Sequence, residues 1–140
     1  YWRAMHVTVP ELRKRGGGAI VNMSSVQGLR GFSGWSAYAA AKGGVNALTV
    51  QTAVDLAPAG IRVNAVAPGT ILTPMNERIF ADLEDGGAAL RDTWNRAHPL
   101  GRFGNPPEVS EAVAFLASDR ASFITGEIVR VDGGLAMKGE

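Results

Sequence analysis

Three side chains between residues 24 and 42 have the types and the spacing for proton chemistry. Tyr38 and Lys42 are four residues apart, so on a helix both side chains lie on one face, one turn apart. An ammonium group beside a phenol favours the phenolate, which lets the tyrosine exchange a proton with a substrate oxygen near neutral pH. Ser25 follows an apolar run at residues 19–23, which is typical of a buried strand. Because open α/β sheets bind ligands at the carboxyl ends of their strands, we expect hydroxyl, phenol and ammonium to meet at one cleft.

The elements that must position these residues alternate between helix and strand along the chain. Apolar periodicity predicts a helix over residues 1–14. Start and stop signals predict two more, over residues 36–56, which Pro58 and Gly60 end, and over residues 106–117, which begin with Pro-Pro-Glu. Short apolar runs predict strands over residues 19–23, 61–67 and 127–131. We expect Ser36 to cap the central helix and Pro10 to kink or break the first one. Strands joined by helices form parallel sheets, so the predicted fold class is α/β.

A long segment at residues 70–105 separates the second predicted strand from the last predicted helix. Two short helical patterns lie within it, at residues 75–83 and 87–96. Segments of this length usually bind ligands or cover a site, so we interpret it as a substrate-binding loop or lid.

The composition fits one globular domain and excludes several classes of site. The chain has 140 residues, of which 46% are hydrophobic and 19% are charged. A formal net charge of +1 gives no electrostatic attraction for nucleic acid or an anionic membrane, so we expect neither as a partner. No apolar run approaches the roughly 20 residues of a membrane-spanning helix. The absence of cysteine excludes disulfides and thiolate metal sites, so we predict no metal and a cytoplasmic protein.

Each motif taken alone has an ordinary structural explanation. Tyr-x-x-x-Lys is common on exposed helices, and a serine pair can simply cap a strand end. The two histidines, His6 and His98, are expected at the surface or in the lid rather than in catalysis. Trp35 and Trp94 either wall a substrate pocket or pack in a core or interface. A serine hydrolase is the rival chemistry, but the chain lacks a Gly-x-Ser-x-Gly elbow.

Four stretches, spread along nearly the whole chain, are specific when taken together. They are Gly-Gly-Ala-Ile-Val-Asn-Met-Ser-Ser at 17–25, Tyr-Ala-Ala-Ala-Lys at 38–42, Ile-Arg-Val-Asn-Ala-Val-Ala-Pro-Gly at 61–69, and Thr-Gly-Glu-Ile-Val-Arg-Val-Asp-Gly-Gly at 125–134. With them the chain resembles the C-terminal half of a short-chain dehydrogenase/reductase. The resemblance implies a partial doubly wound, Rossmann-like parallel sheet that keeps the last three strands with their flanking helices.

The resemblance also implies a role for individual residues. Tyr38 would be the catalytic acid/base, Ser25 would hydrogen-bond the substrate oxygen, and Lys42 would bind the nicotinamide ribose. The expected cofactor-binding residues are Tyr38, Lys42, Pro68, Gly69, Ile71 and Thr73. The expected substrate-binding residues are Ser25, Gln27, Trp35, Met75 and Trp94.

The implied activity is NAD- or NADP-dependent interconversion of a secondary alcohol and a ketone. The glycine-rich turn that binds the cofactor pyrophosphate in the family is absent from the sequence. We therefore expect residues 1–140 to be the C-terminal part of one dehydrogenase domain, inactive by itself, from a homodimer or homotetramer. The alternative is a non-catalytic piece that retains only the oligomerisation surfaces, for which Gly43 and Gly44 would permit close approach of a partner helix or of the sheet.

Overall fold

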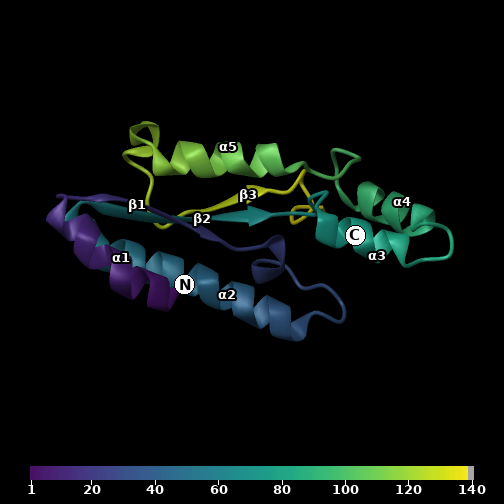
Figure 1. Cartoon of the computed structure of the whole chain (residues 1–140), viewed down its shortest axis with the longest axis horizontal. Coiled ribbons are helices and arrows are strands. Elements are labelled where there is room, and N and C mark those ends of the chain that lie inside the picture. The colour runs from purple at the N-terminus through teal and green to yellow at the C-terminus, as the bar shows by residue number, and fades with distance from the viewer. Residues whose placement is uncertain (139–140) are drawn as a thin grey trace.

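The computed structural model describes residues 1–138 and has an α/β fold with three layers. Its parallel sheet has the order β1-β2-β3, with β1 at Gly18–Met23, β2 at Ile61–Pro68 and β3 at Ile128–Val131. Helices α1 (Trp2–Lys14) and α2 (Ser36–Leu56) cover one face, and α5 (Pro106–Ala117) covers the other (Figure 1). The predicted partial doubly wound sheet is confirmed.

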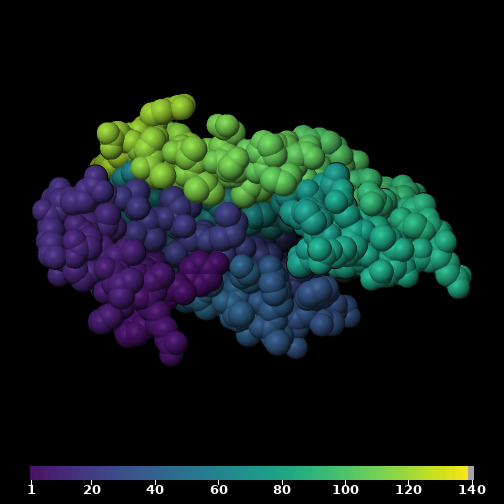
Figure 2. Space-filling model, viewed as in Figure 1, coloured from purple at the N-terminus to yellow at the C-terminus, as the bar shows by residue number. Residues whose placement is uncertain are grey.

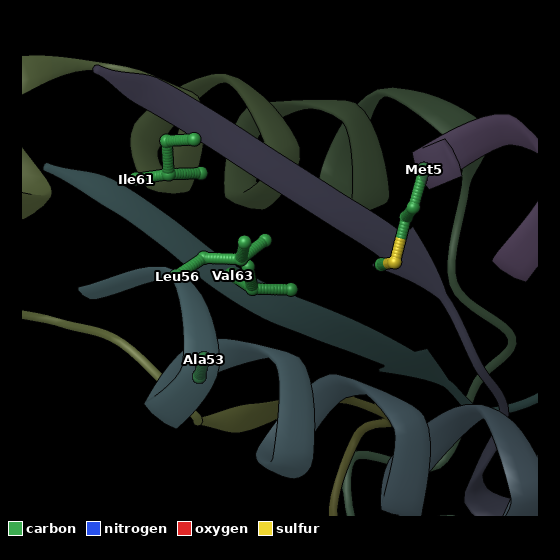
Figure 3. Close-up of a cluster of buried hydrophobic side chains, with 5 residues drawn as sticks. All are labelled: Met5, Ala53, Leu56, Ile61 and Val63. Atoms are coloured by element: carbon green, nitrogen blue, oxygen red, sulfur yellow. The ribbon is translucent and has the colours of Figure 1, made fainter. Parts of the chain in front are cut away.

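The central strand β2 is apolar because helices cover both of its faces. Ile61 and Val63 point toward α1 and α2, where they pack in a cluster with Met5, Ala53 and Leu56 (Figure 3). Val66 points to the opposite face and packs with side chains of α5. Successive strand residues alternate between faces, so one continuous apolar run supplies both cores.

The two long helices differ from expectation in detail. Pro10 lies inside α1 without ending it, although its ring removes one backbone donor. Ser36 was expected to cap α2 but is its first helical residue. Trp35 holds the N-cap position and makes no side-chain capping bond. The bounds predicted for α2 are otherwise confirmed.

The segment at residues 70–105 contains α3 (Pro74–Ala81) and α4 (Ala88–Ala97), as its patterns predicted. Both helices lie beyond the carboxyl ends of β2 and β3 (Figure 1). Between them, the carboxylate of Asp85 accepts hydrogen bonds from the N–H groups of Gly87 and Ala89. These bonds, that of Ala89 first, lower the pKa of Asp85. An aromatic cluster of Phe80, Trp94 and Phe103 holds the two helices together.

Candidate active site

Ser25 lies immediately after β1 and is buried, with 9% of its surface exposed. It caps a short 3₁₀ turn, η1 (Val26–Gly28), by accepting a hydrogen bond from the N–H of Gln27 over 3.2 Å. Its hydroxyl proton is not used in that bond, so Ser25 can still donate to a ligand.

A close contact holds the η1 turn against α2. A Cβ atom on Gly28 would lie 2.8 Å from the carbonyl carbon of Lys42 and from Asn46 Nδ2. The Asn46 amide donates to Gly28 O over 3.0 Å and accepts from the Ser24 hydroxyl over 2.5 Å. Asn46 therefore fixes the turn that carries Ser25. Sequence reasoning missed it, although a polar residue four positions after Lys42 on an apolar helix was a usable signal.

Tyr38 and Lys42 lie on one face of α2, as their spacing predicted. The Lys42 ammonium lies 5.5 Å from the centroid of the Tyr38 ring. It also donates to the main-chain oxygen of Met23 over 3.0 Å, which brings it to the end of β1 beside Ser25. Tyr38 is 40% exposed, and the ring of Trp35 packs edge-on against it at 6.0 Å between centroids. Hydroxyl, phenol and ammonium are thus gathered where β1 meets the N-terminal part of α2.

The loop after β2 contains the residues that were expected to bind cofactor. Pro68 ends the strand, and the N–H of Gly69 donates to Val131 O on β3 over 3.0 Å. A Cβ atom on Gly69 would lie 2.9 Å from Asp132 Cα, so the turn after β3 requires glycine here. We expected this glycine to admit a ligand, and the structure gives another reason for it. Thr73 holds the N-cap position of α3, yet its hydroxyl makes no capping bond.

Among the other expected substrate-binding residues, Gln27, Trp35 and Met75 are at least partly exposed, whereas Trp94 packs against other side chains. Gln27 is half-buried, and its Oε1 has no hydrogen-bond partner within residues 1–138, so it can accept a bond from a hydroxyl. Trp35 is 50% exposed and Met75 is 70% exposed. In Figure 2 a hollow separates the blue N-terminal part of α2 from the teal segment that contains α3. Trp94 packs in the aromatic cluster, with its ring centroid 5.4 Å from that of Phe80.

A separate cavity of about 230 Å³ lies beside Ile71 and is lined by Arg102, Glu108 and Arg130 among others. None of Ser25, Tyr38 and Lys42 lines it. We place the candidate site at those three residues, because they supply the donors and acceptors for proton chemistry.

Within residues 1–138, no three side chains of the metal-binding types are placed to hold a metal ion. Over the same residues, none of the helices has the length and apolar character needed to cross a membrane.

Comparison with known proteins identifies the family of this chain. A family model described as enoyl-(acyl carrier protein) reductase matches residues 1–136. The 3-oxoacyl-(acyl-carrier-protein) reductase of Thermotoga maritima is 46% identical over 131 residues, which are 94% of this chain and 50% of that protein. The cyclohexanol dehydrogenase of an Acinetobacter species is 45% identical over 135 residues, 96% of this chain and 50% of that one.

The chain belongs to the short-chain dehydrogenase/reductase family.

A solved structure of this family has the same fold. The gluconate 5-dehydrogenase of Burkholderia cenocepacia, in complex with NADP and tartrate, aligns with a TM-score of 0.88 at 36% identity. The alignment covers 96% of this short-chain dehydrogenase/reductase chain and 51% of that one. The chain spans about half the length of the curated relatives it matches.

The donor set at the site fits part of a nicotinamide cofactor. Lys42 has three N–H donors and uses one on Met23 O, so two remain for the hydroxyls of a ribose. The N–H of Ile71 donates to no acceptor within residues 1–138 and suits a carboxamide oxygen. The Thr73 hydroxyl is a further donor at the same loop. These groups would hold the nicotinamide end of the cofactor.

Proposed function

We propose that this chain carries the catalytic centre of an NAD- or NADP-dependent oxidoreductase that interconverts a secondary alcohol and a ketone. The proposal depends above all on one observation: the Lys42 ammonium lies 5.5 Å from the Tyr38 ring centroid, beside the strand end that bears Ser25. The same two side chains on an isolated surface helix would have no buried hydroxyl beside them.

Each of the three residues has a separate task in this proposal. The Tyr38 hydroxyl gives a proton to the ketone oxygen, or takes one from the alcohol. Ser25 donates its hydroxyl proton to the same substrate oxygen, since its lone pair already binds the Gln27 N–H. Lys42 orients the ribose and places a positive charge beside Tyr38. The bound nicotinamide supplies the hydride chemistry.

The proposal extends to the remaining predicted residues. The loop formed by Pro68, Gly69, Ile71 and Thr73 would line the nicotinamide, together with Tyr38 and Lys42. Gln27, Trp35, Met75 and Trp94 would contact or shape the substrate site, with residues 70–105 acting as its lid. Relatives named as cyclohexanol and cyclopentanol dehydrogenases favour small cyclic alcohols as first substrates. A cytoplasmic location is also part of the proposal, and the lack of cysteine in the sequence fits it.

The proposed assembly is a homodimer or homotetramer formed through α2. Val50 and Val54 lie on its outer surface and are 49% and 70% exposed. A Cβ atom on Gly44 would meet nothing within 4 Å, which leaves room for a neighbouring helix. Gly43 instead lies near Gly28 O of the same chain, at 4.0 Å from its hypothetical Cβ, so only Gly44 is available to a partner.

The test is a nicotinamide-absorbance assay with cyclohexanol and cyclopentanol as substrates. It uses a full-length dehydrogenase that contains these 140 residues. Tyr38→Phe keeps the ring and removes the proton, so kcat should fall by roughly 10²–10⁴ with little change in cofactor KM. Lys42→Ala should impair both parameters. Lys14→Ala, an exposed lysine on α1, is the matched control. Wild-type turnover that survives Tyr38→Phe unchanged would refute the proposal.

The non-catalytic alternative is tested by calorimetric titration of the 140-residue chain with NADH and NADPH. Its sequence has no glycine-rich turn for the pyrophosphate, so we expect no measurable affinity. Micromolar binding would show that the donor set at Lys42, Ile71 and Thr73 suffices to hold the cofactor.

A further inference from the structure

Within residues 1–138, His98 is the most deeply buried titratable side chain, with 2% of its surface exposed. It ends α4 and lies where three distant parts of the chain meet. Its ring faces Phe103 at 6.2 Å between centroids. A Cβ atom on Gly133, in the turn after β3, would contact the ring carbon Cδ2 at 3.6 Å. His98 was expected at the surface or in the segment at residues 70–105. It lies in that segment, but it is buried rather than at the surface.

Both ring nitrogens of His98 bind main-chain groups whose roles are fixed. Nδ1 lies 2.7 Å from Trp94 O, which can only accept a hydrogen bond, so Nδ1 carries the proton. Nε2 lies 3.2 Å from the Thr70 nitrogen, whose N–H can only donate, so Nε2 carries none. A second proton on the ring would place two N–H groups against each other. The contacts therefore select the neutral Nδ1–H tautomer.

We infer that His98, as this tautomer, is a positioning residue that fixes the Thr70 backbone and joins the loop after β2 to the end of α4. The Thr70 N–H belongs to the peptide just before the one that carries the free N–H of Ile71, so His98 fixes the start of that stretch of the loop. The next peptide is held at Thr70 O, which accepts from the Gly104 N–H over 3.0 Å. The same ring holds the end of α4 through Trp94 O. A shift of the 70–105 lid at α4 is thereby transmitted to the loop in front of the proposed nicotinamide position.

The tautomer can be measured directly, because His6 and His98 are the only histidines in the chain. Nitrogen-15 labelling of histidine gives two sets of ring signals, and His98→Gln assigns them by removing one. We expect a protonated Nδ1 and an unprotonated Nε2 for His98. An Nε2–H tautomer, or signals averaged between the two tautomers, would overturn the inference. The tautomer itself is measured in the wild-type protein, and His98→Gln serves only to assign the signals.

Two matched variants separate the acceptor for Thr70 from the donor for Trp94. The Gln side-chain oxygen in His98→Gln can take the place of Nε2, whereas the amide in His98→Asn can replace only the Nδ1 donor. We expect hydrogen exchange at the Thr70 amide to accelerate about tenfold in His98→Asn and in the ring-preserving His98→Phe, the size of one lost hydrogen bond. His98→Gln should restore slow exchange, and His6→Gln should change nothing. Equal acceleration in His98→Gln and His98→Asn would refute the positioning role.

The inference depends on the proposed function only where it assigns the loop to the cofactor. The tautomer and the Thr70 exchange rate are measured without turnover. If the polypeptide used in the turnover assay is inactive but His98 has the expected tautomer, the proposed function is refuted and the positioning role stands. If that polypeptide is active but His98 has the other tautomer, the positioning role is refuted and the proposed function stands.

Discussion

The Ser24 hydroxyl donates a 2.5 Å hydrogen bond to Asn46 Oδ1, which ties the carboxyl end of β1 to α2. The same Asn46 side chain donates to Gly28 O, beyond Ser25. Ser25 is thus held on both sides by one amide, and the position of its hydroxyl relative to Tyr38 is set by a residue that contacts neither.

Removing this amide should cost both stability and activity. Asn46→Ala removes the donor to Gly28 O and leaves the Ser24 hydroxyl with only its longer bond to Lys42 O, at 3.3 Å, so we expect the unfolding free energy to fall by about 1–3 kcal/mol. Urea denaturation measures this change. Gln51→Ala, at an exposed position on the same helix, should shift the midpoint much less. Equal effects of the two variants would show that Asn46 contributes only helix propensity.

The contact between η1 and α2 should not tolerate a methyl group. Gly28→Ala would place Cβ 2.8 Å from Lys42 main-chain carbon, and rigid helix backbone cannot move aside as a flexible side chain does. We expect a loss of about 1–3 kcal/mol from overpacking. Gly31→Ala is the matched control, because its Cβ would meet nothing within 4 Å. Thermal unfolding of the pair checks this, and similar melting temperatures would contradict it.

The start of α5 should show a defined dependence on acid. The Glu108 carboxylate accepts from Arg102 and from the Asn105 N–H, and these bonds, the Arg102 bond first, lower its pKa from 4.5 to about 2. A lowered pKa in the folded state means that the stabilisation is present above the ordinary value and is lost as pH falls toward about 2. The difference in urea midpoint between wild type and Glu108→Gln should therefore be constant near neutrality and shrink below about pH 4.5. A difference that persists at the acid limit would contradict this.

Met75 and Trp94 should respond differently to truncation, although both were predicted to bind substrate. Met75 is 70% exposed, so Met75→Ala should change the ranking of substrates with little loss of stability. Trp94 packs on Phe80 and Phe103, so Trp94→Ala should lower stability by about 3 kcal/mol or more. Substrate panels and thermal melts on both variants separate the effects. Unchanged ranking in Met75→Ala would remove it from the substrate site.

Strand β1 should promote self-association of the 140-residue chain. The N–H groups of Gly18 and Ser24 bond to the β2 side, so the odd-numbered residues of β1 direct their N–H and C=O groups away from the sheet. An open strand edge of this kind pairs readily with another chain. Ala19→Pro removes one outward N–H and should reduce the fraction of oligomer measured by sedimentation. Ala47→Glu places a charge on the exposed surface of α2 and tests whether association uses that surface instead. A monodisperse wild-type monomer that melts cooperatively above about 60 °C would contradict this prediction.

Features that depend only on neighbouring residues along the chain could be predicted from the sequence. The bounds of α2 follow from local start and stop signals, Ser36 at one end and Pro58 with Gly60 at the other. The shared face of Tyr38 and Lys42 follows from helix geometry. The burial of His98 does not, because Thr70 and Gly133, which surround it, come from the ends of two other strands. The reason for Gly69 was missed for the same cause, since Asp132 lies far along the chain. Contacts between strand ends require the register of the sheet, which no local pattern contains.

The pairing of Trp35 with Tyr38 gives the candidate site an optical reporter of its own. The indole is half exposed to water and lies 6.0 Å from the ring that would transfer the proton, so its emission should be sensitive to anything that enters there. The two other indoles pack on other rings, Trp2 on His6 and Trp94 on Phe80. With both replaced by phenylalanine, quenching of the remaining tryptophan becomes a binding signal that needs neither turnover nor an added dye.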